Sequence, residues 1–119
     1  MGTVNVLLTG ATGFVGERLA CHVDEQGVFK LTCAVRRLGS AVCGNEVFVD
    51  GLSEATDWSE ALAGQTTVVH SAARAHIMKD EVPDPLVEYR KVNVEGTLNL
   101  ARQAAKAGVS RFILSLIHI

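Results

Sequence analysis

The chain has 119 residues, the size of one domain with a hydrophobic core. Its 48% apolar and 20% charged residues are typical of a soluble globular protein. The net charge of −2 argues against nucleic acid and anionic membranes as partners, because both would call for clustered basic residues. No apolar run approaches the roughly 20 residues that are needed to cross a bilayer.

Predicted strands and helices alternate along the chain, and the strands read as apolar runs of the kind that parallel sheets bury on both faces. In chain order we predict a strand at 4–9, a helix from Phe14 to the stop at Gly27, strands at 29–35 and 46–50, a short helix within 56–64, a strand at 66–73, a long helix at 84–108 and a fifth strand beginning at 109–114. This alternation implies right-handed crossovers and therefore a doubly wound parallel α/β sheet.

The chain has three cysteines, Cys21, Cys33 and Cys43. Their number is odd, and their spacing is not that of a metal site. The chain enters its first strand without a preceding signal peptide. We therefore expect reduced thiols, no bound metal and a cytoplasmic location.

Three glycines follow the first strand, in "TGATGFVG" at residues 9–16. In a doubly wound sheet this turn leads into a helix N-terminus, whose free N–H groups and dipole favour a phosphate. Gly10 would take the tight turn, Gly13 would admit a pyrophosphate, and Gly16 would let helix and strand pack closely. A merely flexible turn is the alternative, but the strand before and the helix after the motif favour dinucleotide binding.

The Gly-x-x-Gly-x-x-Gly spacing, with "VVHSAARAH" and "NVEGTLNLARQAAKAGVSRFI", resembles the N-terminal half of extended short-chain dehydrogenases/reductases of the NAD-dependent epimerase/dehydratase family, over residues 4–113. Within that family the chain looks most like UDP-hexose 4-epimerases. The resemblance implies a partial NAD(P)-binding Rossmann domain at 1–113 and NAD or NADP as cofactor. It implies cofactor-binding roles for Gly10, Thr12, Gly13, Phe14, Val15, Gly16, Arg36, Arg37, Asp50, Gly51, Leu52, Ala72, Ala73, Arg74 and Asn93.

Arg36 and Arg37 stand where NAD users of this family usually carry Asp, at the end of the second strand. An arginine there could pair with the 2′-phosphate of NADP or stack on adenine, and two solvated surface arginines are the alternative. The resemblance to epimerases favours NAD instead. After the third strand, Asp50 and Leu52 are separated by Gly51, where the family has an Asp followed directly by an apolar residue that meets adenine. Either Asp50 serves or the adenine contact is weakened.

The loop after the fourth strand, "HSAARAH", matches the family pattern His-x-Ala-Ala. The resemblance places Ala72 and Ala73 beside the cofactor's ribose and nicotinamide. A histidine in an apolar strand is most often a hydrogen-bonded core residue, so we expect that role for His70 rather than catalysis. His70 and His76 lack the spacing of a metal pair.

Asn93 falls inside the long predicted helix, where asparagine is a poor helix former, so the resemblance implies a specific hydrogen bond near the substrate. Gly96 and Thr97 would allow close packing against the sheet. Helix–sheet packing alone is the alternative for all three. The apolar stripe of this helix is expected to be core: Leu98, Leu100, Ala101, Ala104 and Ala105.

The family's proton transfer requires a tyrosine with a lysine four residues later, and a Ser or Thr that binds the sugar hydroxyl. The single tyrosine, Tyr89, is followed at that spacing by Asn93, and Ser115 lies in an altered segment. That segment, "LSLIHI", is the in-frame translation of CTGTCTCTTATACACATC, the end of a transposase sequencing adapter. We expect residues 114–119 to be an adapter-derived tail and the chain as written to be catalytically inactive.

Three functions remain open. The first is the dinucleotide-binding half of a nucleotide-sugar epimerase or dehydratase, with a small nucleotide sugar as substrate and a homodimer as the assembly. The second is a relative of NADP-dependent carbonyl reductases and hydroxysteroid dehydrogenases, which Arg36 and Arg37 favour. The third is a non-catalytic NAD(P)-binding redox sensor. Residues 120 onward would discriminate these three functions, because they would show whether a Tyr-x-x-x-Lys pair is present.

Overall fold

The computed structural model describes residues 4–11, 14–41, 43–71 and 91–114. Five parallel strands form one sheet in the order β3-β2-β1-β4-β5. This confirms the predicted doubly wound arrangement, since β1 lies in the middle and the chain first builds outward on one side and then on the other. The strands are β1 (Val4–Thr9), β2 (Phe29–Val35), β3 (Asn45–Phe48), β4 (Thr67–His70) and β5 (Arg111–Leu114).

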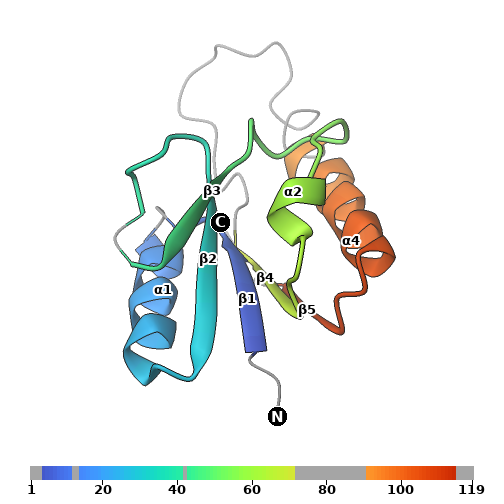
Figure 1. Ribbon diagram of the computed structural model, residues 1–119. Helices are drawn as coiled ribbons and strands as arrows, with labels where there is room; N and C mark the ends of the chain where they lie inside the picture. Colours follow the sequence, from blue (N-terminus) through green and yellow to red (C-terminus); the bar gives the residue numbers. More distant parts are fainter. Residues whose placement is uncertain (1–3, 12–13, 42, 72–90, 115–119) are drawn as a thin grey trace, which may run out of the picture.

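Helices cover both faces of the sheet (Figure 1). Helix α1 (Phe14–Gln26) joins β1 to β2 on one face. On the other face lie α2 (Ser59–Leu62) and α4 (Thr97–Lys106), and α4 continues from the π-helical turn η1 (Lys91–Gly96). Among the described residues, none of the helices has the length and apolar character of a membrane span.

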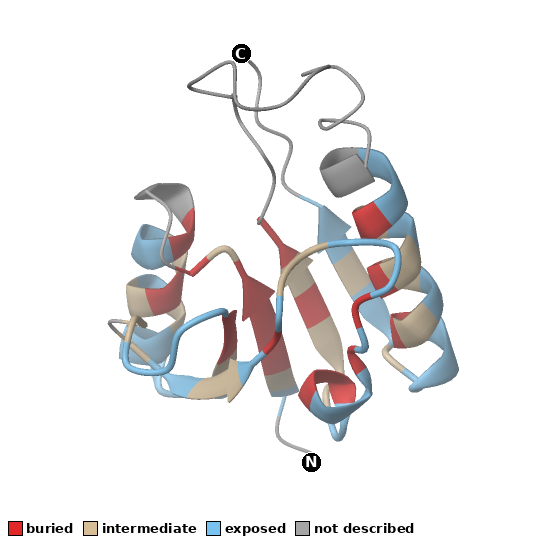
Figure 2. Cartoon of the chain, turned by 90° about the horizontal axis from the view of Figure 1, so that it is seen from above, coloured by how far each residue is buried: buried red, intermediate tan, exposed pale blue. Residues whose placement is uncertain are grey.

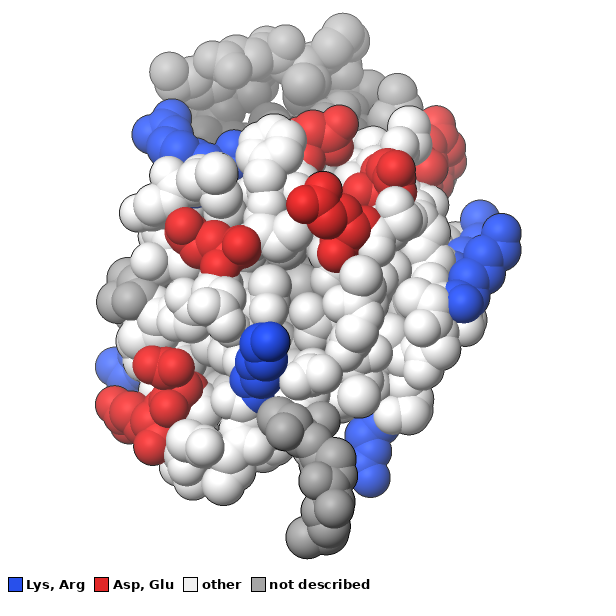
Figure 3. Space-filling model, viewed as in Figure 1, with Lys and Arg blue, Asp and Glu red and all other residues white. Residues whose placement is uncertain are grey.

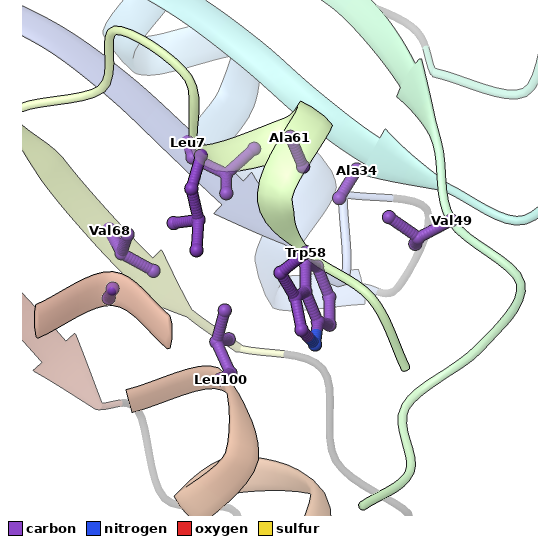
Figure 4. Packing of buried hydrophobic residues seen from close by; sticks show 9 residues of the cluster. Leu7, Ala34, Val49, Trp58, Ala61, Val68 and Leu100 are labelled. Atoms are coloured by element: carbon purple, nitrogen blue, oxygen red, sulfur yellow. The ribbon is translucent and has the colours of Figure 1, made fainter. Parts of the chain in front are cut away.

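The core consists of two layers because side chains of a strand alternate between its faces. On β1, Val6 and Leu8 pack with α1, whereas Leu7 packs with α2 and α4. Figure 2 shows the buried residues concentrated on the central strands and on the helix faces that meet them. In the layer on the α4 side, the indole of Trp58 lies between Leu100 and Val49 (Figure 4).

Element boundaries match the predictions best where the sequence carries strong local signals. The bounds of β1 and β2 are those predicted, and α1 ends just before Gly27, which has a φ of 69°. Strands β3 and β4 are shorter than the predicted runs 46–50 and 66–73. Of the helix predicted at 84–108, the structure describes η1 and α4, which end before Gly108.

The predicted core stripe of α4 is only partly correct. Leu100 and Ala104 are buried, whereas Leu98 is 47% exposed and Ala105 is exposed. A helix lying on a flat sheet buries one narrow stripe, and Leu98 and Ala105 are on its margins. Gly96 extends the buried stripe, since it lies four residues before Leu100.

The short helix α2 begins later than its predicted start. Asp57 accepts hydrogen bonds from the backbone N–H of Ser59 at 2.9 Å and from its hydroxyl at 2.7 Å. These bonds lower the pKa of the Asp57 carboxyl. The N-cap position of α2 is Trp58, which makes no side-chain capping bond, so Asp57 stabilises the entry to the helix from one residue earlier, while Thr56 is used in the preceding loop.

Candidate functional site

Gly10 and Gly16 bring β1 and α1 into contact. Gly10 follows β1 with a φ of 74°, a backbone conformation that side chains disfavour. A Cβ built on Gly16 would overlap the carbonyl oxygen of Gly10. The predicted roles of these glycines in the turn and in close packing are therefore confirmed. Their arrangement leaves the N-terminal end of α1 beside the carboxyl end of β1, which is a geometry suited to a phosphate.

The parallel topology gathers the carboxyl ends of all five strands at one edge, which we call the carboxyl edge. Arg36 and Arg37 directly follow β2 and are exposed. Asp50 is exposed after β3, while Gly51 and Leu52 are half-buried. Because strand order reverses between β1 and β4, the carboxyl edge beside these two strands is the place at which doubly wound sheets bind ligands.

On the face shown in Figure 3, several acidic side chains lie close together in the upper part of the view, whereas the Lys and Arg side chains lie apart from one another. Arg36 and Arg37 are the described cations that directly follow a strand there.

Glu46 of β3 fixes the loop that carries these arginines. Its carboxylate accepts hydrogen bonds from the backbone N–H of Gly39 at 2.7 Å and of Ala41 at 2.8 Å. The bonds from Ala41 and Gly39 lower the pKa of the Glu46 carboxyl. Glu46 thus holds the turn after β2 although it lies on the neighbouring strand.

The loop after β3 is braced from within. The hydroxyl of Thr56, which is buried, accepts a hydrogen bond from Ser53 N–H at 3.1 Å and donates one to the Gly51 carbonyl at 3.1 Å. A Cβ on Gly96 would lie 2.9 Å from Cγ of Leu52, so only glycine lets the loop pack this closely. Gly96 therefore packs against this loop, which the expectation of packing against the sheet did not include.

His70 connects the sheet to α4 through two hydrogen bonds. Its Nδ1 lies 2.7 Å from Oγ1 of Thr9, and its Nε2 lies 2.9 Å from Oγ1 of Thr97. The ring is 1% exposed, and this burial lowers the pKa of His70 to about 4. The prediction of a hydrogen-bonded core histidine is confirmed, because a neutral ring bonded at both nitrogens has a structural role.

Thr9 also anchors the chain where it leaves β4. Ser71 donates its hydroxyl to the Thr9 carbonyl at 2.6 Å, and its backbone N–H lies 3.1 Å from the Thr9 hydroxyl. Sequence reasoning missed Thr9 as a link between β1 and β4. The available signal was that two apolar strands each end in a polar residue, one in a threonine and the other in a histidine.

Of the remaining predicted residues, some lie in described helices and others lie outside the described part of the chain. Phe14 and Val15 open α1, and Asn93 lies in η1. Their roles at a cofactor remain predictions, as does the origin of residues 114–119, of which Leu114 ends β5. The residues outside the description are Thr12, Gly13, Ala72, Ala73, Arg74, His76, Tyr89 and Ser115.

The cysteines lie near one another between α1 and the start of β3. The thiol of Cys33 donates to the Cys43 carbonyl at 3.3 Å, and burial raises the pKa of Cys33 to about 11. The neighbouring Cys21 thiol raises the pKa of Cys43 to about 11 as well. Cys33 and Cys43 are therefore protonated at neutral pH, and in the described residues no three His, Cys, Asp or Glu side chains gather as a metal site.

Comparisons with known proteins place this geometry in a family. The family model described as NAD dependent epimerase/dehydratase family matches residues 6–116. The chain therefore belongs to the NAD dependent epimerase/dehydratase family, as the sequence resemblance predicted.

Individual relatives cover nearly all of this chain with about a third of their own length. UDP-glucose 4-epimerase of Vibrio cholerae is 43% identical over 109 residues, which are 92% of this chain and 33% of that protein. The 3-beta-hydroxysteroid dehydrogenase of Mycolicibacterium neoaurum is 34% identical over 115 residues, 91% of this chain and 30% of that protein.

A solved structure supports the same fold assignment. A short-chain dehydrogenase/reductase superfamily protein from Agrobacterium tumefaciens, crystallised with bound NAD, superposes with a TM-score of 0.71 at 32% identity. The match covers 92% of this chain and 31% of that protein. The Rossmann fold, in the form of its N-terminal part, is thus shown by both sequence and structure.

Proposed function

We propose that this chain is the dinucleotide-binding part of a longer NAD(P)-dependent epimerase or dehydratase. The observation that carries the proposal is the contact of Gly10 with Gly16, which brings a helix N-terminus to the carboxyl end of β1. A Cβ at position 16 would destroy this arrangement. Membership of the family and the NAD bound to a similar protein support the same conclusion.

The cofactor would lie along the carboxyl edge, with its pyrophosphate at the turn between β1 and α1. Adenosine would extend over β2 and β3, because the residues at the end of β2 grip its ribose in dinucleotide-binding sheets. The nicotinamide would then lie over β4, on the side of Ser71. The residues proposed to hold it are Gly10, Thr12, Gly13, Phe14, Val15, Gly16, Arg36, Arg37, Asp50, Gly51, Leu52, Ala72, Ala73, Arg74 and Asn93.

When bound, nicotinamide supplies reversible hydride transfer. The chain's own described residues would contribute a fixed binding surface, since neutral His70 ties β1 and β4 to α4 at the carboxyl edge. We further propose a nucleotide sugar as substrate, on the likeness to UDP-glucose 4-epimerase. A cytoplasmic homodimer is proposed as the working form.

Calorimetry on the full-length protein tests the proposal with two glycine variants. Gly13→Val and Gly16→Val should each weaken NAD(P) binding beyond detection, because a side chain would collide with the phosphates or with Gly10. Glu25→Ala, at the exposed far end of α1, is the control and should bind normally. Unchanged affinity in folded Gly13→Val protein would refute the assignment of the loop.

A second candidate function rests on Arg36 and Arg37. Two exposed arginines after β2 favour the 2′-phosphate of NADP, and a hydroxysteroid dehydrogenase is among the relatives. Under this alternative the longer protein would reduce a carbonyl substrate with NADPH and release the oxidised cofactor. Consumption of NADPH by the full-length protein with a ketosteroid, together with inactivity toward UDP-sugars, would favour it over the epimerase.

A further inference from the structure

Asn99 and Gln103 stand side by side on α4, one helical turn apart, and both face the loop that follows β3. We propose that these two amides are positioning residues for cofactor binding, which hold segment 51–58 in the place where it meets the adenosine half of the dinucleotide. The inference rests on the proposed function, because it assigns a role at the same site.

Asn99 binds two carbonyl groups of the segment. Its Nδ2 donates to the Ser53 carbonyl at 3.0 Å and to the Thr56 carbonyl at 2.8 Å. Between these two carbonyls lies the turn that Thr56 braces through the Gly51 carbonyl. Asn99 therefore connects α4 to the stretch that begins with the predicted adenine contacts.

Gln103 completes the attachment from the next turn of α4. Its Nε2 donates to the Thr56 carbonyl at 2.8 Å and to Oδ1 of Asn99 at 2.8 Å. Its Oε1 accepts the backbone N–H of Trp58 at 2.7 Å. The Thr56 carbonyl thus receives a bond from each amide, and both N–H groups of Gln103 and its oxygen are used.

This pattern of partners requires a primary amide. A carboxylate at position 103 could accept from Trp58 but would lose both donations and face the Thr56 carbonyl with like charge. A methionine would keep the volume and lose every bond. Each of these hydrogen bonds involves a side chain of α4 and none joins its backbone to the segment. The amide side chains, together with the packing of Leu52 against Gly96, therefore fix the position of the segment.

The consequence for binding follows from the geometry of the carboxyl edge. Gly51 and Leu52 open the segment and Asp50 directly precedes it, after β3, on the side of the sheet where adenosine is proposed. Trp58 fixes the far end of the segment, since it is 1% exposed in the core. Without the hydrogen bonds from Asn99 and Gln103, the segment that begins with the proposed adenine contacts would be held only at its two ends.

The test compares Gln103→Glu and Gln103→Met with the parent in the full-length protein. We measure calorimetric affinity for ADP-ribose, which contains the adenosine half, and for nicotinamide mononucleotide by saturation-transfer NMR. Loss of several hydrogen bonds predicts a roughly ten-fold weaker affinity for ADP-ribose with nicotinamide mononucleotide unchanged.

Arg102→Gln is the matched control, because Arg102 neighbours Gln103 on α4 and is exposed. It should leave both affinities unchanged. Equal affinity for ADP-ribose in parent and variants, or equal losses for both ligands, would overturn this inference while leaving dinucleotide binding intact. A parent protein that binds neither ligand would overturn the proposed function and the inference with it.

Discussion

The imidazole of His70 at the end of β4 bonds through Nε2 to the hydroxyl of Thr97 on α4, at 2.9 Å. Its other nitrogen reaches Thr9 on β1, so a single neutral ring links two central strands and a helix. Protonation would place a charge on a side chain that is buried and would turn both ring nitrogens into donors. The hydrogen-bonded bridge therefore makes the fold sensitive to acid.

Stability should fall as the pH decreases from about 6.5 to about 4. Burial lowers the pKa of His70 from 6.5 to about 4 in the folded state, so the unfolded chain takes up a proton in this window that the folded chain does not. By pH 4 the free energy of unfolding should be lower by up to about 3 kcal/mol, because a change of one pKa unit corresponds to roughly 1.4 kcal/mol. Urea denaturation across this pH range measures it.

His70→Gln should flatten that pH dependence, and His22→Gln should not, because His22 is exposed on α1. A profile as steep in His70→Gln as in the parent would show that other groups cause the acid sensitivity.

Replacing Glu46 by Gln should loosen the turn after β2. The variant loses the charged acceptor for Gly39 and Ala41, so we expect these two backbone amides to exchange with solvent several-fold faster. Hydrogen exchange followed by NMR measures the rates, with Glu25→Gln as an exposed control. Identical protection of both amides in Glu46→Gln would disprove the clamp.

Arg36→Asp should shift the cofactor preference of the full-length protein from NADP toward NAD. Charge-assisted bonds to a 2′-phosphate contribute roughly 1.5–3 kcal/mol, which corresponds to ten-fold to more than a hundred-fold in affinity. Calorimetry with both cofactors measures the ratio, and Arg102→Asp on α4 controls for the change in net charge. The same ratio in parent and Arg36→Asp would mean that the arginines are solvated surface residues.

The chain as written should not turn over UDP-glucose or UDP-N-acetylglucosamine with added NAD or NADP. Its single tyrosine, Tyr89, has Asn93 rather than lysine four residues later, so the proton transfer has no donor pair. Low solubility is also expected, because β5 leaves Ile113 52% exposed and Leu114 47% exposed. Turnover above a vector control would contradict this, and His70, Tyr89 and Lys91 would then be mutated first.

Local patterns predicted the sheet because they depend on neighbouring residues alone. The apolar run before Gly10 specified β1, and the left-handed Gly27 specified the end of α1. The role of His70 was also predictable, since a histidine in a buried strand must satisfy its ring nitrogens.

The attachments between distant segments were not predictable in this way. Asn99 and Gln103 are polar residues on a helix, for which solvent exposure is the usual expectation, and their partners lie 43 to 47 residues earlier. Glu46 likewise gave no local sign that it would bond a turn from the neighbouring strand. The spacing of four residues between Asn99 and Gln103 indicated that the two amides share one face of the helix. Only the packing of α4 shows which segment that face contacts.

An NMR titration of glycine amides tests whether NAD(P) binds at the carboxyl edge. NAD(P) should shift the resonances of Gly10 and Gly51, which follow β1 and β3 at the carboxyl edge. Gly27, Gly64 and Gly108, which precede β2, β4 and β5 at the opposite edge, should stay unchanged and serve as internal controls. Shifts confined to these three glycines, or no shift at saturating cofactor, would show that NAD(P) does not bind at the carboxyl edge.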